Sequence, residues 1–345
     1  MKKITMLLLL FLVSDFVRAS HAVIVPSSYQ INGLRYETQG WNNCGPATLT
    51  MALSYFGYEN NQQLAAQWLK PNSEDKNVSP WQMTEFVNTQ LPDLSVQALA
   101  RSGGTLHLLK ELISSDFPVI IEEGYDPEPE RLGWMGHYLL LHSYDDTQAT
   151  FITHDSYSGP NLPYSYEHIE KFWQHFNYNY IVLYQSNQWE KLQEILGNNI
   201  DPNQNYVNAL EIARAEALDN PQDTFAWFNM GTNYAALSMF EEATIAYDQA
   251  RKLGIPWRML WYQFSIYEAY NAVGRYEDTI ELARMVLNDG GGQYVEETYY
   301  YAGVAREGFG EVNRALDNYN AAITFNPNFY PAREARDHLT DSQDN

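Results

Sequence analysis

The sequence predicts an α+β domain followed by an all-helical domain. Three observations lead to this order: segments with helical spacing of apolar residues come first, short β-rich segments follow between residues 117 and 184, and helical spacing returns from Trp189 onward. Helices followed by an antiparallel sheet are typical of the α+β class. A chain of 345 residues is long enough for two such domains, each with its own core.

The composition is that of a globular protein with an acidic surface. Apolar residues make up 45% of the chain and aromatic residues 14%, and the net charge is -22. Nucleic acids and anionic membranes need a basic face, which 21 Lys and Arg residues among 43 acidic ones are not expected to supply. We therefore expect no nucleic-acid partner, and no stable membrane span once the N-terminal segment is removed.

Residues 1–22 are interpreted as a signal peptide. Lys2 and Lys3 precede an apolar stretch over residues 6–13, and residues 20–22 have the small-x-small pattern of a cleavage site. No cysteine follows the apolar stretch, so no lipid anchor is expected. We expect the mature protein to be exported to the periplasm or the extracellular space, where a single cysteine can form no internal disulfide.

The one cysteine of the chain, Cys44, is predicted to begin a helix. Gly45 and Pro46 follow it, and apolar residues then recur with helical spacing as far as Gly57. The unpaired N–H groups and partial positive charge of the first turn stabilise a thiolate and lower the pKa of the thiol. The side-chain amide of Gln39 can join the backbone N–H of Cys44 in holding an oxyanion. The alternative is a small buried residue without chemistry.

Three further helices and four strands are expected in the first domain. The helices are predicted over residues 60–69, 79–87 and 105–113. The strands are predicted over residues 117–121, 138–141, 151–153 and 180–184. Residues 122–136 are rich in Gly, Pro and acid, and we expect them to form a loop that is either a flap beside the site or a plain solvated segment.

A hairpin is expected to place a histidine opposite an aspartate. With the turn centred on Asp146, residues equidistant from it lie opposite each other, and His137 and Asp155 are such a pair. A carboxylate at this position can orient the imidazole. His142 and His154 compete for the role of base, but His142 lies in the middle of an apolar strand and His154 points to the opposite face from Asp155.

These motifs resemble those of a known peptidase family. The motifs are Gln39, the Cys-Gly-Pro-Ala that begins at Cys44, the Gly-His-Tyr around His137 and the His-Asp-Ser-Tyr-Ser-Gly-Pro around Asp155. They are similar to motifs of papain-fold cysteine peptidases related to the bacteriocin-processing, double-glycine leader peptidases. The resemblance covers about residues 28–184. It implies peptide-bond cleavage through an acyl-enzyme, with Cys44 as nucleophile, His137 as base and then acid, Asp155 as orienting carboxylate and Gln39 in the oxyanion hole.

Two departures from the family pattern limit what the resemblance implies. The leader-processing relatives are fused to a membrane transporter, which this chain lacks, so a double-glycine substrate is not implied. Ser156 stands where many relatives have proline. No His-Glu-x-x-His or paired-cysteine spacing occurs, and we expect neither a metal nor another cofactor.

The second half of the chain contains a repeat that resembles the tetratricopeptide unit. One full unit is matched by Trp227, Met230, Gly231, Tyr234, Ala243, Tyr247 and Ala250. The pattern recurs twice, about every 36 residues, in Ile266, Tyr267, Tyr270, Thr279, Ala283 and Val286, and in Tyr299, Ala302, Gly303, Ala315, Tyr319, Ala322 and Pro327. Stacked units bury a core that no single unit could hold. The alternative is an ordinary helical bundle.

The sequence thus predicts three segments: a signal peptide over residues 1–22, a papain-like cysteine peptidase domain over residues 28–186, and a tetratricopeptide-repeat solenoid over residues 189–340. The peptidase would cleave a peptide or protein substrate, and the repeats would recruit that substrate or a protein partner. Two alternatives stay open. The first domain could be inactive within a binding scaffold, or its thiol could act on cell-wall peptides or in acyl or amide transfer.

Overall fold

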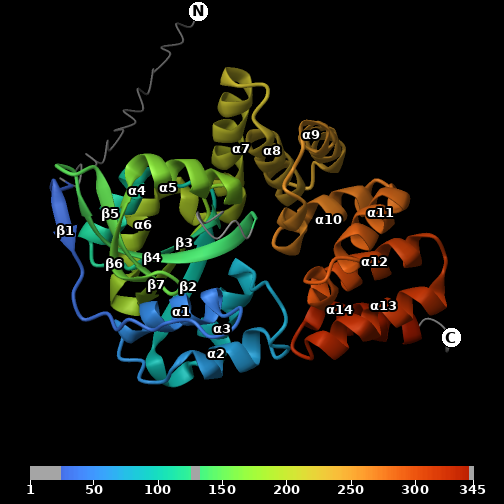
Figure 1. The fold of residues 1–345 in the computed structure, drawn as a ribbon, viewed down its shortest axis with the longest axis horizontal. Coiled ribbons are helices and arrows are strands. Elements are labelled where there is room, and N and C mark those ends of the chain that lie inside the picture. Colours follow the sequence, from blue (N-terminus) through green and yellow to red (C-terminus); the bar gives the residue numbers. More distant parts are fainter. Residues whose placement is uncertain (1–24, 126–132, 342–345) are drawn as a thin grey trace, which may run out of the picture.

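The computed structural model describes residues 25–125 and 133–341. It confirms the predicted fold class, because an α+β domain with an antiparallel sheet is followed by an all-helical region (Figure 1). The predicted signal peptide, residues 1–22, lies outside the described residues. Among the residues that are described, no helix is both long enough and apolar enough to span a bilayer.

The first domain is built on one seven-stranded antiparallel sheet. The strands are β1 (Ser28–Gln30), β2 (Val96–Arg101), β3 (Val119–Tyr125), β4 (Met135–Asp145), β5 (Thr150–Asp155), β6 (Gly159–Ser165) and β7 (Tyr180–Gln185). Their order is β2-β7-β3-β4-β5-β6, and β1 pairs with β4. The helices are α1 (Cys44–Ser54), α2 (Gln62–Leu69), α3 (Pro80–Gln90), α4 (Leu106–Ser114), α5 (Tyr166–Trp173) and α6 (Trp189–Leu196).

Alternate residues of the central strands enter two separate cores. Leu139 and Leu141 of β4 pack with residues of α4, α5 and α6, whereas Tyr138 and Leu140 pack with residues of α1, α2 and α3. In Figure 1 α4 and α5 lie above the sheet, and α1, α2 and α3 lie below it. Because both faces are covered, β4 is apolar along most of its length rather than at every second residue.

The sequence pattern misses three strands and one helix, namely β1, β2, β6 and α5. The strand β6 contains Pro160 and Pro163, which argue against a strand in a sequence. It lies at the edge of the sheet, where a missing N–H leaves no ladder bond unmade. The end of α1 also differs, because the helix stops at Ser54 and Gly57, with φ +86, lies in the turn that follows.

The loop predicted over residues 122–136 is wrong at its two ends, where β3 and β4 extend into it. In the ladder between these strands Glu122 faces Tyr138, Glu123 faces His137 and Tyr125 faces Met135. The central part of the predicted loop, residues 126–132, lies outside the described residues. The buried Glu122 accepts a hydrogen bond from Asn179 Nδ2 at 3.1 Å. Glu122 is therefore tolerated inside this strand because a neighbouring side chain satisfies it.

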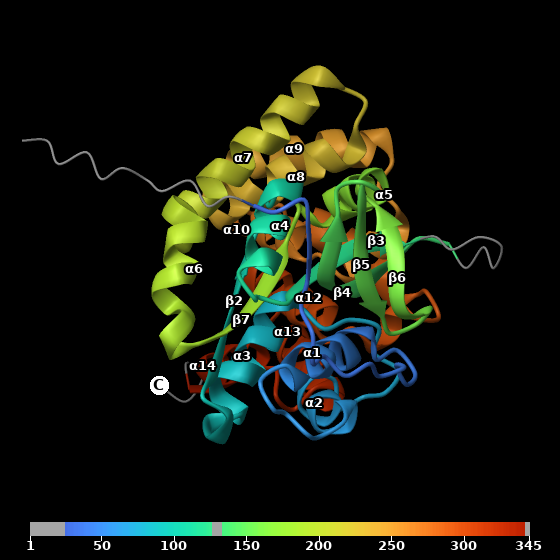
Figure 2. The same ribbon diagram turned by 90° about the vertical axis from the view of Figure 1, so that its left-hand side faces the viewer.

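The all-helical region is a stack of helix pairs that follows α6 (Figure 2). Its helices are α7 (Pro202–Asp219), α8 (Thr224–Ala236), α9 (Phe240–Leu253), α10 (Ser265–Ala272), α11 (Tyr276–Leu287), α12 (Glu296–Gly308), α13 (Val312–Phe325) and α14 (Tyr330–Asp341). A Cβ added to Gly231 or Gly303 would come within 2.6 Å or 2.5 Å of the ring of Tyr247 or Tyr319 in the next helix. The predicted small residues thus let paired helices pack closely.

The helical region returns to the first domain at its C-terminal end, where α13 and α14 lie beside α2 and α3 (Figure 1). Asn326 Nδ2 donates to the backbone carbonyl of Leu69 at 3.1 Å, and Asn328 Nδ2 donates to that of Trp68 at 2.9 Å. These carbonyls belong to the last turn of α2, where no N–H group of the helix itself is left to donate to them. The two asparagines therefore cap α2 from the other end of the chain.

Three carboxyl groups are buried in this interface. Asp75, Glu296 and Glu297 are each 2% exposed. Glu297 Oε1 accepts hydrogen bonds from Asn77 Nδ2 and Ser79 Oγ, both at 3.3 Å. Burial, followed by the charge of the neighbouring Glu296, raises the pKa of Glu297 well above its ordinary value. The interface therefore favours the protonated form of this carboxyl group.

We predict that Glu297→Gln stabilises the protein at alkaline pH. Because folding raises the pKa of Glu297, its contribution to stability is full below the ordinary carboxyl pKa of about 4.3 and is lost as the pH rises through the raised value. Glutamine stays neutral and keeps the oxygen that accepts both hydrogen bonds. We expect the thermal unfolding midpoint to rise by about 2–4 °C at alkaline pH, with a smaller rise toward pH 4.

The control for this prediction is Glu281→Gln, which removes one acidic group from the exposed surface of α11. It should leave the midpoint and its pH dependence unchanged. If Glu297→Gln raised the unfolding midpoint equally at both ends of the pH range, the surroundings of Glu297 would not raise its pKa.

Candidate active site

The four predicted site residues come together at one cleft of about 720 Å³. Gln39, Cys44 and His137 line the cleft, and Asp155 lies behind His137, bonded to it. Cys44 is the first residue of α1, His137 lies on β4 and Asp155 ends β5. The site is therefore assembled from one helix start, two neighbouring strands and the loop before α1.

The start of α1 is pressed against β4. A Cβ added to Gly45 would lie 3.2 Å from Val78 Cβ and 3.5 Å from the ring of Tyr138. Thr48 Oγ1 donates to the backbone carbonyl of Tyr138 at 3.3 Å. This packing sets the thiol of Cys44 beside the strand that carries His137.

The loop before Cys44 is held by a buried glutamine that the sequence does not single out. Gln62, 7% exposed on α2, accepts a hydrogen bond from the backbone N–H of Gly40 at 2.7 Å. Its Nε2 donates to the carbonyl of Thr38 and to Glu37 Oε1, each at 2.8 Å. The sequence around Gln62 is that of an ordinary helix and carries no sign of this role. Only the fold shows that Gln62 positions the loop that contains Gln39.

The predicted register between His137 and Asp155 is wrong, although the two side chains meet. His137 faces Glu123 of β3, and Asp155 faces Leu139, two residues further along β4. The turn is centred beyond Asp146, and the register also shifts between Leu141 and Ser143. Residues two apart on a strand share a face, so His137 Nε2 still lies 2.8 Å from Asp155 Oδ1 on a diagonal.

Asp155 is fully buried, and both oxygens of its carboxylate have partners. Besides His137, Oδ1 accepts hydrogen bonds from the backbone N–H groups of Tyr157 at 2.8 Å and Ser158 at 3.0 Å. Oδ2 accepts one from the hydroxyl of Tyr164 at 2.8 Å. Burial alone would favour the neutral acid, but these bonds and the charge of His137 lower the pKa of Asp155 well below its ordinary value.

The electrostatics favour an ion pair between Cys44 and His137. His137 Nε2 is engaged by Asp155, which leaves Nδ1 for the hydrogen bond between His137 and the thiol. Burial opposes both charges, yet the hydrogen bond and charge of His137 lower the pKa of Cys44, and Asp155 and Cys44 raise the pKa of His137. These shifts favour a thiolate beside an imidazolium over the neutral pair.

Ser156 gives Gln39 a fixed orientation. The Ser156 hydroxyl donates to Gln39 Oε1 at 2.9 Å, and the Gln39 backbone N–H donates to the Ser156 carbonyl at 2.9 Å. The carbonyl oxygen of the Gln39 amide is thus engaged, so its Nε2 remains to donate. Proline, which many relatives have at this position, could not supply this hydroxyl. Ser156 therefore has a structural role that could not be inferred from the sequence.

The competing histidines lie outside the cleft. The rings of His142 and His154 are buried with centroids 4.4 Å apart. Burial and the proximity of His154 lower the pKa of His142 to about 4, and burial lowers that of His154. Both rings are therefore neutral near pH 7, packed within the sheet domain.

The helical region supplies the opposite wall of the cleft. The contributing residues are Arg258, Trp261, Tyr262, Asp289 and Gly291. Trp261 lies in the 3₁₀ helix η5 (Trp257–Trp261), and a Cβ added to Gly291 would clash with its ring. The repeat pattern in the sequence identifies none of these residues, because they lie in the connections between helix pairs.

A protein-family model matches most of the first domain. Residues 24–181 match the model of the Peptidase_C39 like family. No curated protein matches the chain. Among solved structures, the chain is similar to a protein described as a C39-like peptidase from Bacillus anthracis, at 15% sequence identity and a TM-score of 0.38, over 46% of this chain and 98% of that one.

Two structures of MamA are also similar to part of the chain. One is an RS-1 ArsTM double mutant, at 14% identity and a TM-score of 0.36, over 46% of this chain and 85% of that one. The other is residues 41 to the end from Desulfovibrio magneticus RS-1, at 14% identity and a TM-score of 0.36, over 46% of this chain and 83% of that one.

We predict that Cys44 is alkylated by iodoacetamide well below the ordinary thiol pKa of about 8.5. Because His137 lowers the pKa of Cys44, the thiolate persists until the pH falls through that lowered value. His137→Ala should shift the pH profile upward and slow alkylation at pH 7 by about tenfold or more. Cys44 is the sole cysteine, so the label reports one site.

The matched control is His107→Ala, which removes an exposed histidine from α4 and should leave the profile unchanged. Coincident profiles for the wild type and His137→Ala would contradict the ion pair.

Proposed function

We propose that the first domain, which is a Peptidase_C39-like domain, is a cysteine peptidase that cleaves peptide bonds through an acyl-enzyme. The observation that supports this most strongly is the chain of contacts from buried Asp155 through His137 to Cys44 at the mouth of an open cleft. A nucleophile, a base and a group that orients the base are the parts that acyl transfer needs.

In the proposed reaction the thiolate of Cys44 attacks the carbonyl carbon of the scissile bond. The oxyanion that forms is stabilised by the backbone N–H of Cys44 and by Nε2 of Gln39. The imidazolium of His137 gives its proton to the leaving amine as the C–N bond breaks. Water then attacks the thioester, His137 takes a proton from it, and the carboxylic acid leaves Cys44, which returns as a thiolate.

Asp155 and Ser156 act through other residues in this reaction. Asp155 keeps the imidazole of His137 in the orientation that points Nδ1 at the thiol, and its negative charge stabilises the imidazolium. Ser156 keeps the amide of Gln39 turned with Nε2 available for the oxyanion. Both are therefore positioning residues.

The helical region is proposed to select and recruit what the first domain cleaves. Trp261 and Tyr262 present aromatic surface to the cleft, and Arg258 and Asp289 add one charge of each sign. A substrate bound beside Cys44 would contact these residues as well as those of the sheet domain. Substrate choice would then depend on a wall that takes no part in the chemistry.

We further propose that the protein is exported. This proposal is supported by Lys2 and Lys3 ahead of an apolar stretch in residues 1–22, which lie outside the described part of the chain.

We predict a graded loss of peptide hydrolysis across three variants. Cys44→Ala should abolish cleavage of a mixture of unstructured peptides, measured by mass spectrometry. Gln39→Ala should lower kcat by about 10²- to 10³-fold, because one oxyanion donor is lost. Ser156→Ala should lower kcat less than Gln39→Ala, since the amide is loosened but still present.

The same variants separate the peptidase from the inactive scaffold. Gln39→Ala and Ser156→Ala should retain the alkylation profile of Cys44, because neither residue contacts the thiol. Peptide cleavage that survives in Cys44→Ala would place the activity elsewhere. No cleavage by a wild-type protein whose thiol is reactive would favour thiol chemistry on another substrate class.

A second prediction concerns the wall that the helical region supplies. Gly291→Ala should displace Trp261, whose ring leaves no space for a Cβ. We expect kcat/KM for peptides to fall by about tenfold while the alkylation of Cys44 stays unchanged. Gly290→Ala is the control, because a Cβ there meets no atom within 4 Å. Equal kinetics for the two variants would show that the wall does not contact the substrate.

A further inference from the structure

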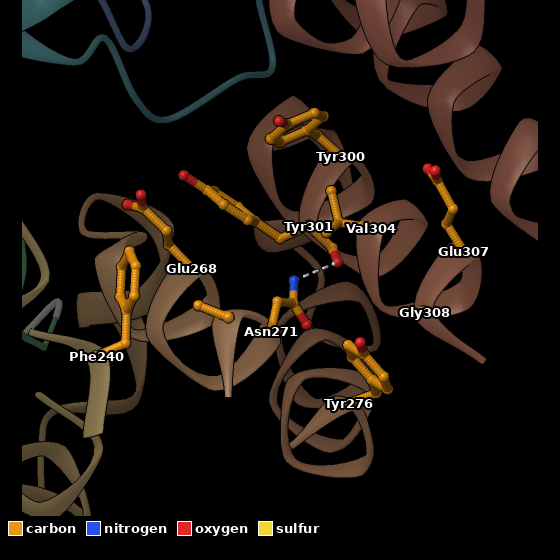
Figure 3. Close-up of a pocket in the computed structure, with 10 residues that line it drawn as sticks. Phe240, Glu268, Asn271, Tyr276, Tyr300, Tyr301, Val304, Glu307 and Gly308 are labelled. Carbon is orange, nitrogen blue, oxygen red and sulfur yellow. Dashed lines mark hydrogen bonds between the residues drawn. The ribbon is translucent and has the colours of Figure 1, made fainter. Parts of the chain in front are cut away.

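A second hollow lies within the helical region, away from Cys44. It is a groove of about 560 Å³ between α10 and α12 (Figure 3). The helix α10 contributes Glu268 and Asn271, and α12 contributes Tyr300, Tyr301 and Glu307. An adjoining hollow of about 390 Å³ shares Tyr300 and Glu307 and adds Glu334. The described residues that line the two hollows include three glutamates and neither Lys nor Arg.

The carboxylates in this groove are available to a ligand. Glu268 makes no hydrogen bond or ion pair with any described residue, and it is open to solvent. The surrounding protein raises its pKa by partly desolvating the carboxyl group, and a nearby cation would favour its charged form. Glu307 Oε2 accepts a hydrogen bond from Tyr319 at 2.7 Å, which orients the second carboxylate.

Asn271 supplies an independent sign of a missing partner. Its side chain is 8% exposed, and its Nδ2 donates to the backbone carbonyl of Tyr301 at 3.1 Å. Its Oδ1 is buried without a hydrogen-bond partner among the described residues. Figure 3 shows this amide between the two helices, with its nitrogen directed at Tyr301. An unpartnered buried acceptor is unfavourable, and a donor from a bound chain would remove the penalty.

Tyrosine rings complete the chemistry of the groove. Tyr276 and Tyr300 present their rings to it, in addition to Tyr301 (Figure 3). Ring faces attract cations and pack against the methylene stems of long basic side chains. Carboxylates, aromatic surface and the buried side-chain acceptor Asn271 Oδ1 together match an extended peptide that carries lysine or arginine.

We propose that this groove binds an extended, unstructured segment of another protein that carries lysine or arginine side chains. Glu268 and Glu307 pair with the cations, the tyrosines hold the side-chain stems, and Asn271 Oδ1 accepts a backbone N–H of the segment. The net charge of -22 favours the approach of such a segment over that of an acidic one. The binding does not require that the first domain be active.

The test measures the affinity of a fluorescent peptide of about a dozen residues, in which lysine alternates with glycine and serine, by anisotropy at physiological salt. All variants are made in full-length Cys44→Ala, so that the peptide is not cleaved. Glu268→Gln with Glu307→Gln should weaken binding by about tenfold, because two charge-assisted contacts become neutral. A peptide with glutamate in place of lysine should not bind.

The matched control is Glu242→Gln with Glu281→Gln, which removes the same charge from exposed positions on α9 and α11, outside the groove. It should change affinity by less than about twofold. Equal weakening by the two double variants would show general attraction to an acidic surface and overturn the proposal, as would full affinity in the groove variant.

A third arm tests the backbone contact. Asn271→Ala should weaken binding of the lysine peptide, but it should not weaken further a peptide whose backbone nitrogens are methylated, since that peptide has no N–H to donate. An equal effect of Asn271→Ala on both peptides would remove Asn271 Oδ1 from the binding site.

Discussion

The burial of the Asp155 carboxylate is the constraint on which the arrangement of the site depends. A buried charge is tolerated when its oxygens are hydrogen-bonded, and Asp155 has donors from His137, Tyr157, Ser158 and Tyr164. These donors come from β4, from the turn after β5 and from β6. A change in the register of any of the three segments would leave the charge short of a partner, so the charge and the register stabilise each other.

The sequence could indicate which residues meet, but not how they meet. Helical spacing and the Cys-Gly-Pro pattern were enough to place Cys44 at a helix start, which is a local property. The contact between His137 and Asp155 also follows from their positions at the ends of neighbouring strands. Its geometry differs because the turn is centred beyond Asp146 and the register changes again after Leu141, and neither the exact centre of a polar turn nor an irregularity in an apolar strand has a signature in the composition around it.

The cleft wall from the helical region lay beyond sequence reasoning for a different reason. Trp261 and Gly291 are far apart from Cys44 in the chain, and they reach it only because the whole stack of helix pairs curves back. The repeats themselves could be recognised in the sequence because the same packing positions recur in each unit. In the first and third units a glycine on one helix faces a tyrosine on the next. The middle unit has the reverse order, with buried Tyr267 at the glycine position and buried Ala283 at the tyrosine position, so the total side-chain volume is nearly kept.

The two-sided cleft constrains how this protein can change over time. Under the proposed function the reacting groups lie on one wall and the substrate contacts on both, so the first domain taken alone would keep its nucleophile and lose part of its binding surface. Arg258 and Asp289 of this wall are half-buried in connections between helices, whereas Trp261 belongs to the core of the helical region, so the two charged residues can change with the least disturbance of the core. New substrates could therefore be acquired by substitutions in these connections, while the reacting groups of the first domain and the packed helices of the second region stay unchanged.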